Sequence, residues 1–326
     1  MELHAVYMSN DGYAPYAGIS FTSLFENNKD IEDITIHYLD VGVSKENINK
    51  LKSIADKYDR NIIFYKINDE EFCKNLGINV SHSHFIYLDL FLHKILPSNI
   101  DKVLKLDSDS IITGSLKDLW NEDIEDYCLA AALEIKLNID SANHYKKSLG
   151  LKETDPYINA GVLLINLKKF REMNFDSQFV KYINDNNPVY CDQDTINVIL
   201  KDKIKIVDLR YNFFPELPKI GYENVIKWTK NQYYYSKKEY LEALDNISFI
   251  HFQFGLAGRP WFKNIDLPFS EEFDKYAKLS PWSYDEVYTD EKAPLKHRLL
   301  AFSVYKLPFN LFLSGLSFIR KLKGWE

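Results

Sequence analysis

What this 326-residue sequence has little of excludes several classes of protein. It contains only three cysteines, Cys73, Cys128 and Cys191, which are odd in number and far apart. Neither a disulfide framework nor a zinc knuckle is therefore indicated, and a reducing, cytoplasmic setting is the simplest expectation. No apolar run approaches the roughly 18 residues of a membrane-spanning helix. The N-terminal stretch MELHAVYMSND lacks the basic and apolar parts of a signal peptide.

Basic residues are also fewer than acidic residues. The chain has 40 Lys and Arg against 47 Asp and Glu, a net charge of −7. Such a chain is not suited to bind a polyanion over its whole surface, so nucleic acid is not expected as a partner. Any phosphate chemistry must then depend on a metal ion or on a few local basic groups. Aromatic residues are abundant at 15%, and their ring faces suit both cores and carbohydrate platforms.

Apolar runs alternate with amphipathic segments along most of the chain. The pattern predicts helices at 14–25, after an N-cap at Ser44, and at 85–96. Further helical segments are expected after 167, with one at 192–201. Strand–helix alternation predicts an α/β fold with a mostly parallel sheet flanked by helices. The expected strands are at 3–8, 35–39, 61–67, 102–112, 128–134, 160–167 and 247–252.

Polar residues follow two of these expected strands. Ser9 to Gly12 come after the first strand, and Asp107-Ser108-Asp109 come after the apolar run KVLKL. Ligands of parallel sheets bind outside the carboxyl ends of the strands. We therefore expect both polar clusters to face one crevice.

The composition changes near residue 269. Residues 269–293 are polar and acidic, whereas residues 294–325 contain no acid. We predict a main domain at 1–268 and a C-terminal, mainly helical region at 269–326. The basic, apolar tail could lie in a membrane interface or pack on the main domain, and both interpretations stay open. Its basic residues are Lys296, Arg298, Lys306, Arg320, Lys321 and Lys323.

The Asp107-Ser108-Asp109 triplet is a candidate metal site. Two carboxylates just past a strand can bind one hard divalent cation, and oxygen ligands suit Mg²⁺ or Mn²⁺. A second such triplet, Asp192-Gln193-Asp194, shows that the pattern also arises without a metal. A solvated strand end is therefore the competing explanation. The apolar strand that leads into Asp107 favours the metal.

His251 follows another apolar run and precedes a loop that contains Gly255 and Arg259. A glycine backbone can approach a phosphate closely, and a guanidinium can bind phosphate oxygens. The pattern favours metal and diphosphate binding, although a lone histidine there is also typical of a hydrogen-bonded core residue. Asn159, Ala160 and Gly161 offer small side chains and an amide against which a sugar could lie. A capped turn is the alternative there.

Six motifs, in order over roughly residues 3–261, resemble glycosyltransferase family 8. This family includes bacterial lipopolysaccharide and surface-glycan hexosyltransferases and glycogenin. The most specific motif is YINAGVLLINLKKF at 157–170. The others are NDGY at 10–13, LKLDSD at 104–109, DQDTIN at 192–197, DLRYN at 208–212 and HFQFGLAGRPW at 251–261.

The resemblance implies a GT-A fold, a UDP-sugar donor, a bound Mn²⁺ or Mg²⁺ and retention of anomeric configuration. It places Asp107, Asp109 and His251 as metal ligands. Gln193 would stabilise positive charge on the sugar, and Asp192 would orient its hydroxyls. The remaining donor-binding residues would be Met8, Asn10, Tyr13, Asp107, Ser108, Glu134, Asn159, Ala160, Gly161, Gly255 and Arg259.

Four departures from the family pattern bear on the donor. Asn10 replaces the usual first Asp of the nucleotide turn, and Asp89 stands in YLDLFLHKILP where the family usually has Arg. Arg259 replaces the Lys before Pro-Trp. His251 lies two residues farther from Pro260-Trp261 than usual.

The expected function is transfer of galactose or glucose from a UDP-sugar to a glycan, glycoprotein or glycolipid, at the inner face of the membrane or in the cytoplasm. A metal-dependent nucleotidyltransferase and a catalytically silent sugar-nucleotide or glycan-binding module are the alternatives. The first alternative usually needs a basic loop near the N-terminus, and residues 8–18 contain no Lys or Arg.

Overall fold

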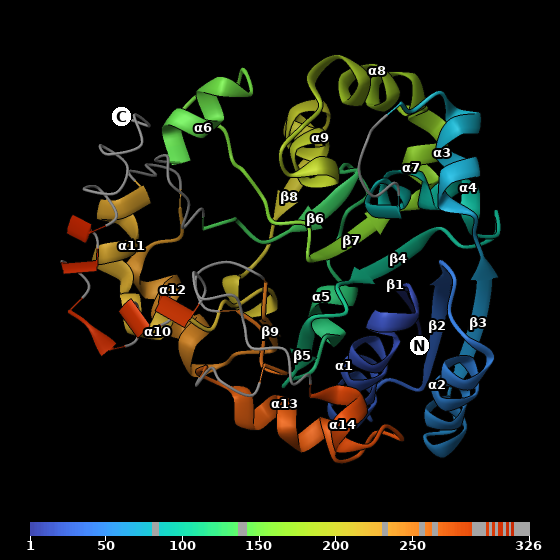
Figure 1. Cartoon of the computed structure of the whole chain (residues 1–326). Coiled ribbons are helices and arrows are strands. Elements are labelled where there is room, and N and C mark those ends of the chain that lie inside the picture. The colour runs from blue at the N-terminus through green and yellow to red at the C-terminus, as the bar shows by residue number, and fades with distance from the viewer. Residues whose placement is uncertain are drawn as a thin grey trace.

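The structure, a computed structural model, describes most of the chain. The described residues are 1–79, 85–135, 142–229, 234–253, 258–262, 267–288 and short stretches between 298 and 315. Gly255 and most of the basic tail at 294–326 lie outside them. A twisted sheet runs through the molecule with helices on both sides (Figure 1).

The sheet has seven strands in the order β3-β2-β1-β4-β7-β6-β8. Strand β7 runs antiparallel to its neighbours β4 and β6, whereas the other neighbouring pairs are parallel. The expected α/β fold with a mostly parallel sheet is confirmed. The bounds are β1 (Glu2–Ser9), β2 (Asp33–Asp40), β3 (Asn61–Lys66), β4 (Lys102–Leu106), β6 (Leu129–Ala131), β7 (Val162–Asn166) and β8 (Ile204–Ile206).

Helices cover both faces of the sheet, which explains why its strands are apolar on both sides. In β1, Ala5 and Tyr7 pack in one core cluster and Val6 in the other. The first face is covered by α1 (Ala14–Asn27), α2 (Lys45–Lys57), α5 (Lys117–Trp120), α13 (Ser270–Ala277) and α14 (Tyr284–Val287). The second is covered by α3 (Asp69–Leu76), α4 (Leu92–Ile95), α7 (Leu167–Met173), α8 (Asp176–Asn186), α9 (Cys191–Ile199), α10 (Leu217–Ile220), α11 (Tyr222–Thr229) and α12 (Lys237–Asp245).

The predicted helices can be compared with those of the structure, which also has several short helical elements. Ser44 caps α2 as expected, because its side chain accepts a hydrogen bond from the Asn47 amide. The helix expected at 85–96 is instead a 3₁₀ helix, η2, followed by α4. The remaining short elements are η1 (Asp11–Tyr13), η2 (Phe85–Phe91), η3 (Lys201–Lys203), η4 (Leu209–Tyr211) and α6 (Ala142–Ser148).

The prediction of a single strand at 102–112 is wrong. The chain leaves the main sheet after Leu106, and Ser110–Ile112 form β5 of a separate two-stranded sheet. Its partner is β9 (Phe249–His251), and the register places Ser110 opposite His251. The Asp107 carbonyl accepts a hydrogen bond from the Ser110 hydroxyl (2.6 Å), which stabilises the bend. The break brings His251 beside the acidic triplet.

The segment after residue 267 packs against the N-terminal helices. Asn27 of α1 donates to the Tyr276 hydroxyl (2.6 Å), and the Trp282 indole donates to Asn47 of α2 (2.8 Å). The division into domains at 1–268 and 269–326 stays a prediction. Among the described residues, no helix is both long enough and apolar enough to span a membrane.

Gly18 tests this packing. A Cβ at Gly18 would lie 2.4 Å from the Trp282 ring and 3.2 Å from Ile54 Cδ1. We expect Gly18→Ala to lower the free energy of unfolding by about 1–3 kcal/mol through overpacking, which exceeds the gain of about 1 kcal/mol that Ala gives in a helix. Urea denaturation measures the change. The loss should shrink in a Trp282→Leu background, and a Gly18→Ala protein more stable than wild type would contradict the contact.

Candidate active site and metal centre

A cavity of about 530 Å³ opens at the carboxyl ends of β1 and β4. Every described residue that the sequence places in the site lines it, with the exception of Glu134, and Gly255 lies outside the described residues. Residues of both polar clusters, Ser9 and Asn10 of the first and Asp107 to Asp109 of the second, line it as expected, and the Ser108 hydroxyl donates to the Met8 carbonyl (3.1 Å). The members of this set that line the cavity are Met8, Asn10, Tyr13, Asp107, Ser108, Asp109, Asn159, Ala160, Gly161, Asp192, Gln193, His251 and Arg259.

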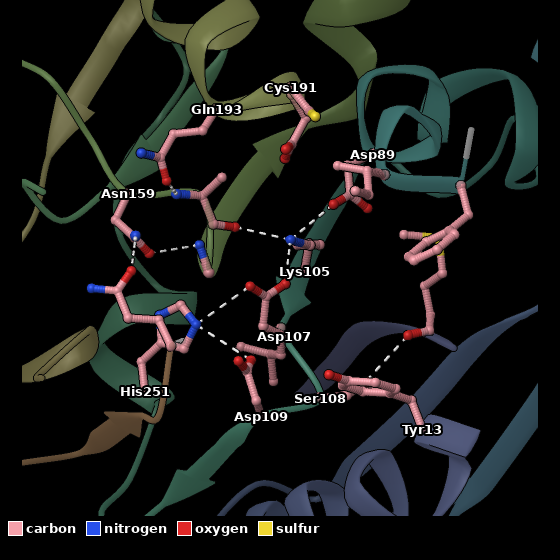
Figure 2. A pocket seen from close by; sticks show the side chains of 18 of the residues that line it. Tyr13, Asp89, Lys105, Asp107, Ser108, Asp109, Asn159, Cys191, Gln193 and His251 are labelled. Carbon is pink, nitrogen blue, oxygen red and sulfur yellow. Dashed lines mark hydrogen bonds and ion pairs between the residues drawn. The ribbon is translucent and has the colours of Figure 1, made fainter. Parts of the chain in front are cut away.

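Asp107, Asp109 and His251 converge at one point of this cavity (Figure 2). One ligand atom from each lies within 4.8 Å of the others. His251 Nε2 is 3.5 Å from Asp107 Oδ2 and 3.3 Å from Asp109 Oδ1. Two carboxylate oxygens and one imidazole nitrogen at this spacing suit a divalent transition metal such as Mn²⁺.

Each of these three side chains has a second polar atom, which does not face the shared point and is bound by a different neighbouring residue. Lys105 Nζ donates to Asp107 Oδ1 (2.6 Å), and Arg259 pairs with Asp109 Oδ2. His251 Nδ1 is 3.0 Å from Oδ1 of the Asn212 side chain. The one remaining oxygen of each acid and the Nε2 atom therefore face the shared point.

Asn212 fixes the tautomer of His251. The side-chain Nδ2 of Asn212 donates to Asn159 Oδ1 (2.7 Å), so the side-chain Oδ1 of Asn212 must face the imidazole. Nδ1 then carries the hydrogen and donates it, and the Nε2 lone pair is free to bind a metal. The Gly161 amide also donates to Asn159 Oδ1 (2.8 Å), which fixes the orientation of that side chain.

Buried charges surround Lys105. Burial disfavours the charged form of Lys105, but Asp107 and Asp89 raise its pKa above the usual value. Burial opposes ionisation of Asp107 as well, yet Lys105 and His251 hold the pKa of that carboxyl below its usual range. Burial raises the pKa of Asp192 to about 8, with Lys105 opposing the shift and Asp89 adding to it. Burial thus opposes the ionised form of the acids in this part of the cavity, and Lys105 is the cation that favours it.

Gln193 and Asn159 form the wall next to this cluster. The Ala160 amide donates to Gln193 Oε1 (3.0 Å), and Asn159 Nδ2 donates to Glu134 Oε2 (2.5 Å). Gln193 Nε2 is 3.3 Å from the same Glu134 oxygen. Glu134 therefore orients both amides although it does not line the cavity.

The second acidic triplet has a different role. Asp192 and Gln193 line the cavity from the start of α9, whereas Asp194 is fully buried away from it. Asp194 accepts hydrogen bonds from the Tyr157 hydroxyl (2.5 Å) and the Tyr145 hydroxyl (2.6 Å). Its carboxylate is used to hold α9 in place, which leaves Asp107-Ser108-Asp109 as the triplet that faces a histidine.

A cluster of aromatic rings adjoins the cavity through Tyr13, which lines it together with Asn10. The Tyr16 and Trp261 rings stack with centroids 3.7 Å apart, and Tyr13 packs edge-on against Trp261. Asn10 caps the short helix η1, since its side chain accepts from the Tyr13 amide (3.2 Å). This replacement for the usual acid thus has a local structural role.

Sequence reasoning missed Lys105 and Asn212. A lysine at position 105, between the apolar residues Leu104 and Leu106, was a signal, because a buried ammonium needs anionic partners. Asn212 gave no such signal, since its value depends on a register that only the folded chain shows. Asp89 was noted as an inverted charge, and the structure pairs its Oδ2 with Lys105 Nζ at 2.8 Å.

Gly161 gives a test of the metal centre. A Cβ at this residue would lie 2.2 Å from His251 Cε1 and 2.9 Å from Asn159 Oδ1, so the imidazole would have to move. We expect Gly161→Ala to weaken Mn²⁺ binding about 10- to 100-fold, as loss of ligand orientation does elsewhere. Electron paramagnetic resonance of free Mn²⁺ measures it. Gly12→Ala is the control, because a Cβ there meets only Asn10 Oδ1 at 3.7 Å. Unchanged Mn²⁺ affinity in Gly161→Ala would remove His251 from the ligand set.

Known proteins are similar to this chain in sequence. A putative glycosyltransferase of Haemophilus influenzae is 34% identical over 216 residues, which are 65% of this chain and 64% of that protein. The match thus spans less than two thirds of the Haemophilus protein. A lipopolysaccharide 1,2-glucosyltransferase of Escherichia coli is 28% identical over 84% of this chain and 77% of its own length.

Solved structures agree in fold. The galactosyltransferase LgtC, solved in complex with donor and acceptor sugar analogs, is 25% identical with a TM-score of 0.71, over 87% of this chain and 98% of that chain. The model of the family described as glycosyl transferase family 8 matches residues 4–264. That range includes every residue that lines the cavity, and the chain therefore belongs to glycosyl transferase family 8.

Proposed function

We propose that this protein is a retaining, metal-dependent hexosyltransferase that moves galactose or glucose from a UDP-sugar to a sugar-bearing acceptor. The observation that carries the proposal is the convergence of Asp107, Asp109 and His251 in a cavity at the carboxyl ends of β1 and β4. Asp192 and Gln193 line the same cavity, so a donor bound there would span the metal side and the sugar side.

Asp107, Asp109 and His251 would hold the metal, and Mn²⁺ or Mg²⁺ fits a set with two carboxylate oxygens. A bound divalent cation supplies positive charge to the diphosphate that leaves with the nucleotide. Lys105 and Arg259 each hold one of the two acids, so the metal side carries two fixed cations beside two carboxylates. With a divalent ion added, its net charge becomes positive, which suits a diphosphate.

Gln193 and Asp192 would act on the sugar. An amide is a poor nucleophile, and Gln193 is further held by the Ala160 amide at 3.0 Å. We therefore favour attack by the acceptor from the face that the leaving group departs from, with Gln193 stabilising positive charge at the anomeric carbon. Asp192 would orient the sugar hydroxyls. The remaining proposed donor contacts are those of Met8, Asn10, Tyr13, Ser108, Asn159, Ala160, Gly161, Gly255 and Arg259, with Glu134 behind them.

The acceptor is proposed to be a growing surface glycan, on a glycoprotein or lipid. Similar proteins include a lipopolysaccharide 1,2-glucosyltransferase of Escherichia coli and a lipopolysaccharide 1,3-galactosyltransferase of Salmonella typhimurium. The basic, apolar tail at 294–326 would bring a cytoplasmic enzyme to the membrane face where such acceptors lie.

UDP release from UDP-galactose and UDP-glucose, with and without Mn²⁺, tests the proposal. We expect slow metal-dependent release by wild type without acceptor. Asp107→Asn should lower kcat/KM at least about 100-fold, because metal stabilisation of the leaving group is worth several kcal/mol. Asp101→Asn is the matched control, since that exposed aspartate lies at the opposite end of β4.

Other outcomes contradict the proposal. Pyrophosphate release from a nucleoside triphosphate and a sugar phosphate would indicate a nucleotidyltransferase. Tight UDP-sugar binding without turnover under any metal would indicate a silent binding module. Full activity of Asp107→Asn in the presence of a chelator would exclude the proposed metal centre.

A further inference from the structure

A single buried ammonium joins the two sides of the cavity. The Lys105 side chain is only 7% exposed. Its Nζ atom is 2.6 Å from Asp107 Oδ1, 2.8 Å from Asp89 Oδ2 and 2.9 Å from the Ala160 carbonyl oxygen (Figure 2). An ammonium has three hydrogens to donate. All three are used within the protein, so Lys105 has none left for a ligand.

The contact with Asp107 determines which oxygen is available. Lys105 occupies Oδ1, and Oδ2 is the oxygen that faces His251 Nε2 at 3.5 Å. A metal at the shared point would therefore bind Asp107 through one oxygen only. The same ammonium lies beside the metal and reduces the negative charge that attracts it.

The contact with Asp89 leaves a carboxylate oxygen without a partner. Asp89 is 5% exposed and lines the cavity. Its Oδ2 atom binds Lys105, whereas its Oδ1 atom is buried and has no hydrogen-bond partner among the residues that the structure describes. A buried carboxylate oxygen costs free energy unless it accepts a hydrogen bond. A hydroxyl group of a bound ligand would supply that bond.

The neighbouring groups determine which kind of sugar fits. Asp192 lines the same part of the cavity, and Glu134 lies behind Gln193 and Asn159. Asp89 and Asp192 are thus the acidic side chains that line the sugar side, and Lys105 is the one ammonium that contacts it among the described residues. This arrangement suits the hydroxyls of an uncharged sugar. The carboxylate of a sugar acid would find no ammonium hydrogen to bind there, because Lys105 donates all three of its hydrogens within the protein.

We propose that Lys105 is a positioning residue that fixes Asp107 for the metal and Asp89 for the donor, and that Asp89 selects a neutral hexose by accepting a hydrogen bond from one of its hydroxyls. The inference rests on the proposed function and names a specificity residue within that site. It also assigns a role to the aspartate that stands where the family usually has an arginine.

Asp89→Asn tests the sugar contact. We expect the KM for UDP-galactose or UDP-glucose to rise about tenfold or more, the usual effect of losing a hydrogen bond to a charged group. The dissociation constant of UDP itself, measured by calorimetry with Mn²⁺, should change less than about threefold, since UDP lacks the hexose. UDP-glucuronic acid should be a poor donor for wild type. Asp176→Asn is the control, because Asp176 pairs with Lys94 at 2.6 Å without lining the cavity.

The outcomes separate this inference from the proposed function. Wild type that fails to bind UDP with Mn²⁺ would count against the function itself. Normal UDP binding with an unchanged UDP-hexose KM in Asp89→Asn would overturn the role of Asp89. Equal weakening of UDP and UDP-hexose would place Asp89 on the diphosphate instead. Wild type that uses UDP-glucuronic acid as well as UDP-glucose would overturn the selection of a neutral sugar.

Mn²⁺ affinity without nucleotide tests the positioning role of Lys105. Lys105→Gln releases Asp107 Oδ1, so Mn²⁺ should bind more weakly and UDP-hexose turnover should fall, although a positive charge beside the metal is also removed. Asp89→Asn removes a negative charge on the far side of Lys105, so Mn²⁺ should bind more weakly. Electron paramagnetic resonance measures both, and circular dichroism checks the fold. Mn²⁺ binding by Lys105→Gln that is unchanged or tighter would show that Lys105 acts through its charge alone, and that result would overturn the positioning role. If Lys105→Gln does not fold, Asp89→Asn decides through its KM and UDP affinity.

Discussion

The site depends on three side chains that point one polar atom each at the same place, two from the connection between β4 and β5 and one from the end of β9. This is possible because each side chain has its other polar atom held by a different partner. Lys105 holds Asp107, Arg259 holds Asp109 and Asn212 holds His251. Two acids this close would otherwise repel each other and rotate toward water. The partners fix a geometry that a divalent cation can use without reorganising the protein.

The backbone supplies the rest of the constraint. The chain leaves the main sheet at the acidic triplet and pairs again with β9 in a small second sheet. The Asp107 amide donates to the Gly161 carbonyl (2.9 Å), and the Phe252 amide donates to the Asp109 carbonyl (2.8 Å). These bonds join the triplet to both the sugar wall and the histidine strand. The parts of the cavity proposed to hold the metal and the sugar are therefore joined by backbone hydrogen bonds, as the proposed reaction at the bond between them requires.

Much of the fold was predictable from periodicity. Apolar runs gave the strands, and Ser44 gave the start of a helix, because these signals depend on local sequence. The break between β4 and β5 was not predictable, since an apolar run on each side of the triplet looks like one strand. The antiparallel direction of β7 also depends on pairing between distant segments, which periodicity does not report.

The candidate site shows the same division. Asp107, Asp109 and His251 could be chosen because their residue types and motif context point to a metal, and the structure places them together. Their supporting residues were less visible. Asn212 can orient His251 only because η4 and β9 lie side by side. Lys105 can be buried as an ammonium only because Asp89 of η2 faces β4. An ion pair between residues of different elements, such as that of Lys105 with Asp89, cannot be predicted from the order of residues in the sequence alone.

One measurement tests the central claim most directly: the anomalous scattering of Mn²⁺ in crystals grown with UDP. The account predicts a single peak about 2.1 Å from Asp107 Oδ2, Asp109 Oδ1 and His251 Nε2, a normal length for such ligands. It also predicts diphosphate oxygens on the open side of that peak. Manganese bound elsewhere, or UDP bound without it, would contradict the account.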